Sequence, residues 1–160
     1  MSGGELTLVA ATAADLDDVM QVMAESFDPE FGEAWTFGQC ASLLPMAGVW
    51  LTLAREGDMP VGFSLSRLVA GEAELLLLAV RRSAQRRGVG STLLRAFIAD
   101  AQARGAERLH LEVRHGNSAA RLYSNAGFEE VGRRFNYYRG VSGHKHDAIT
   151  LARPAAADQR

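Results

Sequence analysis

The chain is poor in the features that mark specialised classes of protein. It has one cysteine among 160 residues, Cys40, which excludes an intramolecular disulfide and a cysteine-built metal site and favours a reducing compartment. Its 17 Lys and Arg against 19 Asp and Glu give a formal net charge of −2, so no global field draws in nucleic acid or an anionic membrane. Any polyanion must therefore be bound locally.

Membrane-spanning and targeting segments are also missing from the sequence. The longest apolar run is far below the roughly 20 residues that span a bilayer. Residues 1–5 lack the basic region of a signal peptide, and Ser2 stands where myristoylation requires glycine. We therefore expect a cytoplasmic protein with no membrane partner. No repeat and no Pro/Gly/Ser-rich linker divides the chain, which predicts one domain over residues 1–160 with loose ends at 1–4 and 154–160.

The chain does have the apolar content of a globular domain. Apolar residues make up 48% of it and charged residues 22%, and 17.3 kDa is enough to bury a sizeable core. Apolar periodicity predicts an α/β fold, a mixed sheet of about seven strands with helices on both faces. The expected strands are 5–10, 49–54, 61–68, 72–80, 108–114, 128–139 and 144–151, and the expected helices begin near 15 and cover 35–44, 89–104 and 117–126.

Two of the expected strands have unusual patterns. The strand 72–80 ends in an unbroken apolar run, which predicts a central strand covered on both faces. The strand 108–114 alternates, so that Leu109, Leu111 and Val113 point one way and His110, Glu112 and Arg114 the other. A polar face on an interior strand indicates that these side chains line a cleft.

A glycine-containing turn, Gln85-Arg-Arg-Gly-Val-Gly-Ser91, connects the strand 72–80 to the most amphipathic expected helix. Backbone N–H groups and a helix N-terminus meet at such a turn and favour an anion. A P-loop is excluded because no lysine follows the glycines, and the dinucleotide fingerprint is excluded because Leu93 stands where its third glycine is needed. An anion site and an ordinary turn with solvated arginines both remain possible on these residues, with charge available from Arg81, Arg82, Arg86 and Arg87.

The segment Leu-Ala-Val80 with Gln85-Arg-Arg-Gly-Val-Gly90 resembles the acetyl-CoA-binding motif of the GCN5-related N-acetyltransferase (GNAT) superfamily, whose pattern is Gln/Arg-x-x-Gly-x-Gly/Ala. The resemblance continues through Leu-Glu-Val-Arg114, Leu-Tyr123, Ala-Gly-Phe128 and Arg-Arg-Phe-Asn-Tyr-Tyr138. These segments are similar above all to those of the bacterial ribosomal-protein-alanine N-acetyltransferases. The resemblance implies the GNAT fold and a direct transfer of acetyl from acetyl-CoA to a protein N-terminal α-amine.

The resemblance also implies a role for particular residues. It assigns the proton acceptor to Glu112, with Glu74 on the neighbouring strand as the alternative base, and the proton donor to the leaving thiolate to Tyr123. The alternatives to these roles are a solvated or Arg-paired carboxylate for Glu112 and a core aromatic for Tyr123. The residues implied to bind acetyl-CoA are Leu78, Ala79, Val80, Arg86, Arg87, Gly88, Val89, Gly90, Ser91 and Asn117; no metal is expected.

One spacing departs from the family. The family commonly has seven positions from its motif Asn to its Tyr, whereas Asn117 and Tyr123 are six apart. Six positions leave two side chains about 120° apart on a helix. Either Asn117 is displaced or the helix begins differently, and the contact of Asn117 with acetyl-CoA is open.

Several features leave alternatives. His144 and His146 have no third ligand for a metal and are expected at the surface, Cys40 is expected to be a small buried side chain, and Tyr137 and Tyr138 suit a peptide groove or the core. The acceptor is a protein N-terminus, a small-molecule amine in the first alternative, or absent in a non-catalytic CoA-binding module. A monomer and a homodimer are both compatible with the sequence, and nucleic acid is not expected as a partner.

Overall fold

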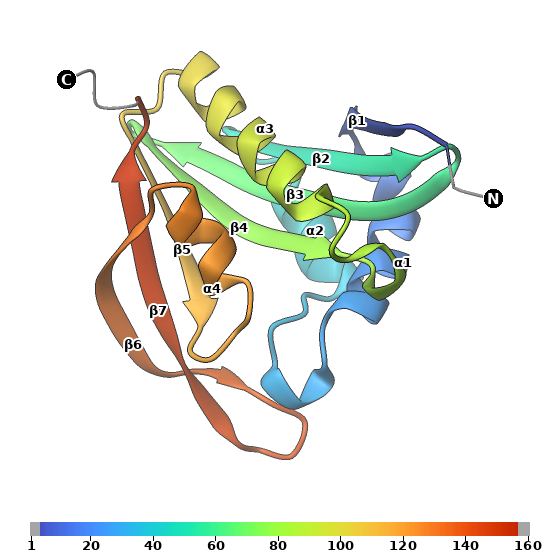
Figure 1. Ribbon diagram of the computed structural model, residues 1–160. Helices are drawn as coiled ribbons and strands as arrows, with labels where there is room; N and C mark the ends of the chain where they lie inside the picture. The colour runs from blue at the N-terminus through green and yellow to red at the C-terminus, as the bar shows by residue number, and fades with distance from the viewer. Residues whose placement is uncertain (1–3, 157–160) are drawn as a thin grey trace.

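The computed structural model describes residues 4–156 and shows one seven-stranded sheet in the order β1-β2-β3-β4-β5-β7-β6 (Figure 1). Neighbouring strands are antiparallel except β4 and β5, which are parallel and lie near the centre. The predicted mixed sheet and the central place of the strand 72–80 are thus confirmed. The strands are β1 (Leu6–Ala11), β2 (Val49–Glu56), β3 (Met59–Val69), β4 (Glu72–Val80), β5 (Arg108–Arg114), β6 (Glu129–Arg139) and β7 (Lys145–Pro154).

Helices cover both faces of the sheet (Figure 1). On one face, α1 (Leu16–Ser26) and α2 (Phe37–Leu43) pack on β2 to β4 through a core that includes Phe63 and the buried Cys40. On the other face, α3 (Val89–Ala103) and α4 (Ala120–Asn125) pack on a second core around Phe97 and Leu111. Among the helices of residues 4–156, none is long and apolar enough to cross a membrane.

Three predicted boundaries are wrong for identifiable reasons. The helix α2 begins at Phe37, after Thr36 accepts a capping hydrogen bond from the Gln39 N–H, so Trp35 lies outside it. The helix α4 begins at Ala120 rather than Asn117. The chain is not loose at 154, because β7 runs to Pro154 and the N–H of the buried Ala155 donates to Glu107 O. The remaining expected loose ends fall mainly outside the described residues.

A bulge in β4 opens the sheet at its centre. The register with β3 pairs Leu65 with Leu77 and Ser66 with Leu75, so Leu76 is an extra residue on β4. The parallel pairing of β4 with β5 also ends there, at Leu75 and Leu111. Beyond these residues the two strands diverge (Figure 1), and the backbone of β4 from Leu76 to Val80 is left without a strand on that side.

Candidate active site

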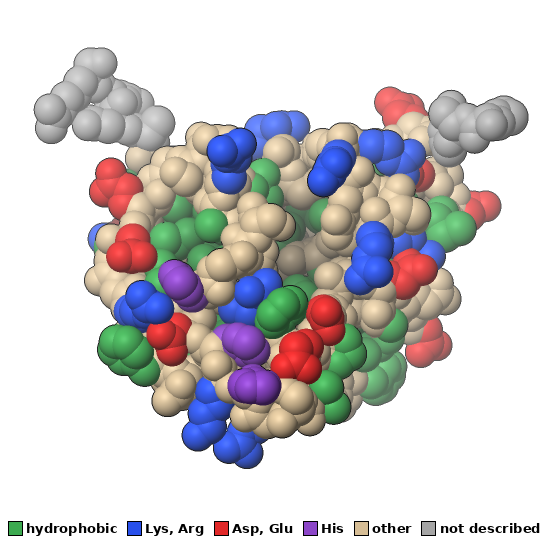
Figure 2. Space-filling model, turned by 60° about the horizontal axis from the view of Figure 1, so that its bottom comes forward, with side chains coloured by type: hydrophobic (Ala, Val, Ile, Leu, Met, Phe, Trp, Pro, Cys, Tyr) green, Lys and Arg blue, Asp and Glu red, His purple; other side chains and the backbone are tan. Residues whose placement is uncertain are grey.

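A cleft occupies the place where β4 and β5 diverge. Figure 2 looks toward the lower side of the molecule, which is hollowed above the histidine side chains. Its walls come from both strands, from the loop between α1 and α2, from α4 and from β6. Residues lining it are Phe27, Glu33, Trp35, Glu74, Leu75, Leu76, Leu77, Leu78, Leu111, Glu112, Val113, Asn117, Ala119, Tyr123, Tyr137 and Tyr138. A larger apolar groove of about 750 Å³ beside β1 contains none of the predicted site residues.

The pairing of β5 with β4 ends at Leu111. Glu112 is therefore the first residue of β5 without a partner on β4, and its side chain lines the cleft. Its carboxylate is 9% exposed. One oxygen, Oε2, accepts from Thr150 Oγ1 at 2.7 Å, and the other, Oε1, accepts from Arg134 Nε at 2.9 Å. The structure therefore unites the two sequence interpretations, because the carboxylate is paired with an arginine and lines the cleft.

Glu74, the alternative base, also lines the cleft from β4, where it lies opposite His110 in the register. His110, whose Nε2 lies 3.8 Å from Glu74 Oε1, and Arg67, whose Nη2 donates a hydrogen bond to the same oxygen at 3.3 Å, hold the pKa of the Glu74 carboxyl below its ordinary value, although burial opposes them. The nearby carboxylate of Glu74 in turn raises the pKa of His110. A carboxylate with a lowered pKa is a weaker proton acceptor, which argues against Glu74 as the base.

Tyr123, on α4, belongs to the core and to the cleft wall at once. Its ring is 6% exposed and meets Phe128 edge to face, with 6.2 Å between the ring centroids. Burial, and then the negative charge of Glu33, raise the pKa of the Tyr123 phenol well above its usual range. The phenol is therefore protonated near neutral pH, which is the form that donates a proton.

Tyr137 and Tyr138 line the cleft from β6. Their rings meet edge to face at a centroid distance of 5.0 Å. Tyr137 is half exposed, whereas Tyr138 is largely buried and its hydroxyl donates a long hydrogen bond to Glu112 O (3.5 Å). Both tyrosines thus line the cleft, as the groove interpretation expected.

The turn before α3 has the backbone geometry of an anion site. Arg86 has φ +67° and Gly88 φ +81°, and Thr92 N–H is the first to bond back into the helix, to Gly88 O at 3.0 Å. The N–H groups before Thr92 therefore meet no acceptor in the preceding helical turn. No atom of residues 4–156 lies within 4 Å of the position that a Cβ would take on Gly88.

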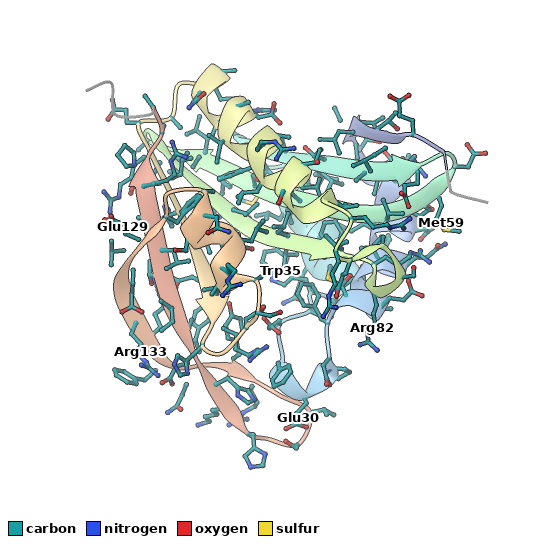
Figure 3. All side chains as sticks on the ribbon, viewed as in Figure 1. Glu30, Trp35, Met59, Arg82, Glu129 and Arg133 are labelled. Atoms are coloured by element: carbon teal, nitrogen blue, oxygen red, sulfur yellow. The ribbon has the colours of Figure 1, made fainter. Side chains whose placement is uncertain are left out.

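Two of the four arginines around this turn form ion pairs. Arg81 pairs with Glu25 at 3.0 Å and Arg87 with Glu56 at 2.8 Å, while Arg82 and Arg86 are exposed. Arg82 lies just before α3 (Figure 3). Gly90 is close to β4 and α4, since a Cβ there would meet Leu122 and Val80 side chains at 3.4 and 3.6 Å. The open turn, the two αL residues and the start of a 15-residue helix fit a pyrophosphate.

Asn117 lies in a turn before α4 rather than on the helix. Its Oδ1 accepts from Ala119 N–H at 2.8 Å, and its Nδ2 donates to Glu33 Oε2 at 2.9 Å. The later helix start accommodates the six-residue spacing to Tyr123. Glu33 was not predicted as a site residue, and no motif marks it, because it lies 84 positions from Asn117 and 81 from its other partner, Arg114.

The histidine pair lies at the tip of the β6–β7 hairpin. His144 Nδ1 is 3.6 Å from Glu30 Oε1, and His146 packs edge to face on Phe31 with a centroid distance of 5.3 Å. Within the described part of the chain, no group of three or more His, Cys, Asp or Glu side chains is suited to a metal ion.

The fold and the cleft are those of an acyl-transferring enzyme class, and the model of the acetyltransferase (GNAT) family matches residues 16–128. The chain therefore belongs to the GNAT acetyltransferase family, as its motifs predicted. Among proteins of known name, it is 43% identical over 98 residues to the [ribosomal protein bS18]-alanine N-acetyltransferase of Salmonella typhimurium, an alignment that covers 61% of this chain and 66% of that protein. It is 42% identical over 105 residues to the N-alpha-acetyltransferase RimI of Mycobacterium tuberculosis, covering 62% and 63%.

The chain thus matches just under two thirds of the length of these relatives. Solved structures extend the likeness over almost the whole chain. The ribosomal-protein-S18-alanine N-acetyltransferase of Escherichia coli superposes with a TM-score of 0.84 at 29% identity, over 97% of each chain. NAA60 of Arabidopsis thaliana, solved with a bisubstrate analogue, shares the fold with a TM-score of 0.79 at 17% identity.

Proposed function

We propose that the chain is an acetyl-CoA-dependent N-acetyltransferase whose acceptor is the N-terminal α-amine of a protein, most simply a ribosomal protein that begins with alanine. The observation that carries the proposal is the cleft, which holds the Glu112 carboxylate and the protonated phenol of Tyr123 beside an anion-binding turn. The names of the relatives in Salmonella typhimurium and Escherichia coli support the acceptor class.

Acetyl-CoA fits the described residues at two places. The turn from Arg86 to Ser91 offers N–H groups and the start of α3 to the pyrophosphate. The end of β4, Leu78 to Val80, has no paired strand on the cleft side and offers its backbone to the rest of the molecule. When bound, acetyl-CoA supplies a thioester carbonyl that is activated toward an amine. The contact of Asn117 is the exception, because its amide is already bonded to Glu33.

Glu112 handles the proton of the acceptor. An α-amine with a pKa of about 7.7–8.0 is mostly protonated near neutrality, so it must lose a proton before it reacts. The carboxylate of Glu112 accepts this proton, and the hydrogen bonds from Arg134 and Thr150 fix its orientation. The phenol of Tyr123, which also lines the cleft, donates a hydrogen bond or its proton to the departing thiolate. No covalent acyl-enzyme is required, which agrees with a lone cysteine, Cys40, buried away from the cleft.

One part of the cleft wall is rich in aromatic side chains. Phe27 and Trp35 come from the α1–α2 loop and Tyr137 and Tyr138 from β6 (Figure 3 labels Trp35). Aromatic side chains offer large apolar surfaces, and each tyrosine adds a polar group, which suits contact with a peptide acceptor.

The test is the release of free CoA thiol from acetyl-CoA with a panel of acceptors. We expect turnover with peptides that begin with alanine, including ribosomal-protein N-termini, and none with the same peptides carrying a blocked N-terminus. Turnover only on free amino acids, polyamines or aminoglycosides would replace the protein acceptor by a small-molecule amine. Binding of acetyl-CoA without turnover on any acceptor would leave a CoA-binding module instead.

A further inference from the structure

The loop between α1 and α2, residues 27–36, forms one wall of the cleft and is named here the acceptor loop. Glu33 is its most enclosed charged residue, with a side chain that is 10% exposed. Both carboxylate oxygens are used: Oε1 accepts from Arg114 Nε at 3.2 Å and Oε2 from Asn117 Nδ2 at 2.9 Å. Glu33 therefore fastens the acceptor loop to the end of β5 and to the turn before α4.

Arg114 completes this contact from the other side. Its side chain is 13% exposed, and its guanidinium carbon lies 3.7 Å from the centroid of the Phe31 ring, also in the acceptor loop. The ion pair and the cation–π contact thus join the same two segments twice. An ion pair this enclosed is costly to break from one side, because the remaining charge stays buried without a partner.

Asn117 extends the contact to the candidate proton donor. Its Oδ1 accepts from Ala119 N–H at the entry to α4, a helix of only six residues that carries Tyr123. A helix of this length has little stability of its own, so the position of Tyr123 depends on what holds its ends. Glu33 holds the N-terminal end through Asn117.

We propose that Glu33 is a positioning residue that couples the acceptor loop to α4, so that the wall that receives the peptide and the phenol of Tyr123 are set by one carboxylate. In this arrangement Asn117 acts as the link between them and not as a ligand of acetyl-CoA. The inference rests on the proposed function for its kinetic consequence, but its structural part stands on the contacts alone.

The test compares Glu33→Gln with Glu30→Gln, the same change in the same loop. Glu30 is 40% exposed and bonds to the hairpin tip outside the cleft, so it is the matched control. We expect Glu33→Gln to raise the KM for an alanine-starting peptide about tenfold and to lower kcat about tenfold, with the KM for acetyl-CoA unchanged. Glu30→Gln loses only exposed side-chain contacts with the hairpin tip and keeps the backbone bond from Val141 N–H to Pro29 O, so kcat and both KM values should change less than about twofold. Equal effects of the two variants would overturn the proposal.

A second variant, Asn117→Ser, removes the hydrogen bond between Asn117 and Glu33 and leaves Glu33 bonded to Arg114. Serine at a helix entry still accepts a hydrogen bond from the Ala119 N–H, but it is too short to reach Glu33. We expect a lower kcat with little change in either KM. A raised KM for acetyl-CoA would instead make Asn117 a ligand of acetyl-CoA and contradict the proposal.

Amide hydrogen exchange gives a readout that needs no activity. In Glu33→Gln, residues 27–36 and 117–125 should exchange faster together, whereas in Asn117→Ser only residues 117–125 should do so, and the start of α3 should be unchanged in both. Faster exchange in the acceptor loop alone would refute the coupling. If the wild-type protein acetylates no acceptor, the proposed function fails, and hydrogen exchange still decides whether Glu33 couples the two segments.

Discussion

At the scale of single residues, the cleft contains charges that are already satisfied. Glu112 accepts hydrogen bonds from Arg134 and Thr150, Glu74 accepts one from Arg67, and Glu33 accepts one from Arg114. Each carboxylate is thereby fixed in direction before any substrate arrives. This arrangement reduces the reorganisation that proton transfer requires, since the acceptor oxygen does not have to be brought into place.

Substitution of the two candidate bases distinguishes them. We expect Glu112→Gln to lower kcat/KM for an alanine-starting peptide by about 100-fold at pH 7, because the amine then has no proton acceptor. The deficit should shrink at pH 9.5, where an amine with a pKa of about 7.7–8.0 is already neutral. Glu74→Gln should change the rate less than about threefold at both pH values, as its lowered pKa makes it a poor base.

The pH–rate profile of the two variants decides the assignment. Affinity for acetyl-CoA, measured by calorimetry, is the control and should be nearly the same in both. An unchanged profile in Glu112→Gln would remove Glu112 from the role of base, and a large loss in Glu74→Gln would transfer that role to Glu74.

The sequence predicts part of this constellation. Glu112 and Tyr123 are marked by a motif and by the polar face of one strand. The contacts of Glu112 are not marked, because Arg134 and Thr150 lie 22 and 38 positions from Glu112 and reach it through a sheet whose last two strands are out of sequence order. Glu33 is further still from its partners. Contacts of this kind depend on strand order, which local patterns do not contain.

At the scale of elements, two local features create the donor side of the site. The first is the extra residue Leu76 in β4, which coincides with the end of pairing to β5. No signal in Leu75-Leu-Leu-Leu78 distinguishes a bulge from a regular strand, so the sequence predicts the strand but not its opening. The second is the left-handed turn at Gly88, which two glycines and a preceding strand do predict.

The turn can be tested with a pair of glycines at the two ends of α3. Gly88 and Gly105 have φ of +81° and +90°, and in the part of the chain that the structure describes no atom lies within 4 Å of where a Cβ would stand on either. Alanine at either site should cost about 1 kcal/mol of unfolding free energy, because an L residue is strained in this conformation. Only Gly88→Ala should also raise the KM for acetyl-CoA, by about tenfold, since its Cβ occupies the approach to the N–H groups.

Urea unfolding and the KM for acetyl-CoA are the two measurements. A similar loss of stability in both variants, with a raised KM in Gly88→Ala alone, supports the anion site. If Gly105→Ala raised the KM equally, the effect would come from strain in α3, and an unchanged KM in Gly88→Ala would exclude the turn as the pyrophosphate site.

At the scale of the whole molecule, two segments that lie far apart in the sequence, the acceptor loop and the β6–β7 hairpin, are in contact. The acceptor loop meets the tip of the β6–β7 hairpin, where Val141 N–H donates to Pro29 O at 3.1 Å. Gly140 and Gly32 make the approach possible, because a Cβ on Gly140 would overlap the carbonyl of Glu30 and one on Gly32 would overlap that of Arg139. The acceptor loop and the tip of the β6–β7 hairpin are therefore bridged by close backbone contacts.

Disrupting this bridge should weaken the binding of the acceptor peptide and leave the binding of acetyl-CoA unchanged. We expect Gly140→Ala to push the hairpin away from the acceptor loop, to raise the KM for an alanine-starting peptide about tenfold and to lower the melting temperature by about 5 °C. The KM for acetyl-CoA should not change. Gly132→Ala, also on the β6 side, is the control, since its Cβ would make an ordinary contact with Thr150 at 3.8 Å. Equal effects of the two substitutions would argue against the bridge.

The donor side and the acceptor side of the cleft depend on different kinds of structure, so they can change independently in evolution. The donor side depends on backbone geometry, namely a bulge, a left-handed turn and the start of α3, and backbone geometry tolerates few substitutions. The acceptor side depends on side chains of a loop and a hairpin, which lie far from that geometry in the sequence. Selection can therefore exchange one acceptor for another through a few changes in the loop and the hairpin, while every descendant inherits the same acyl donor.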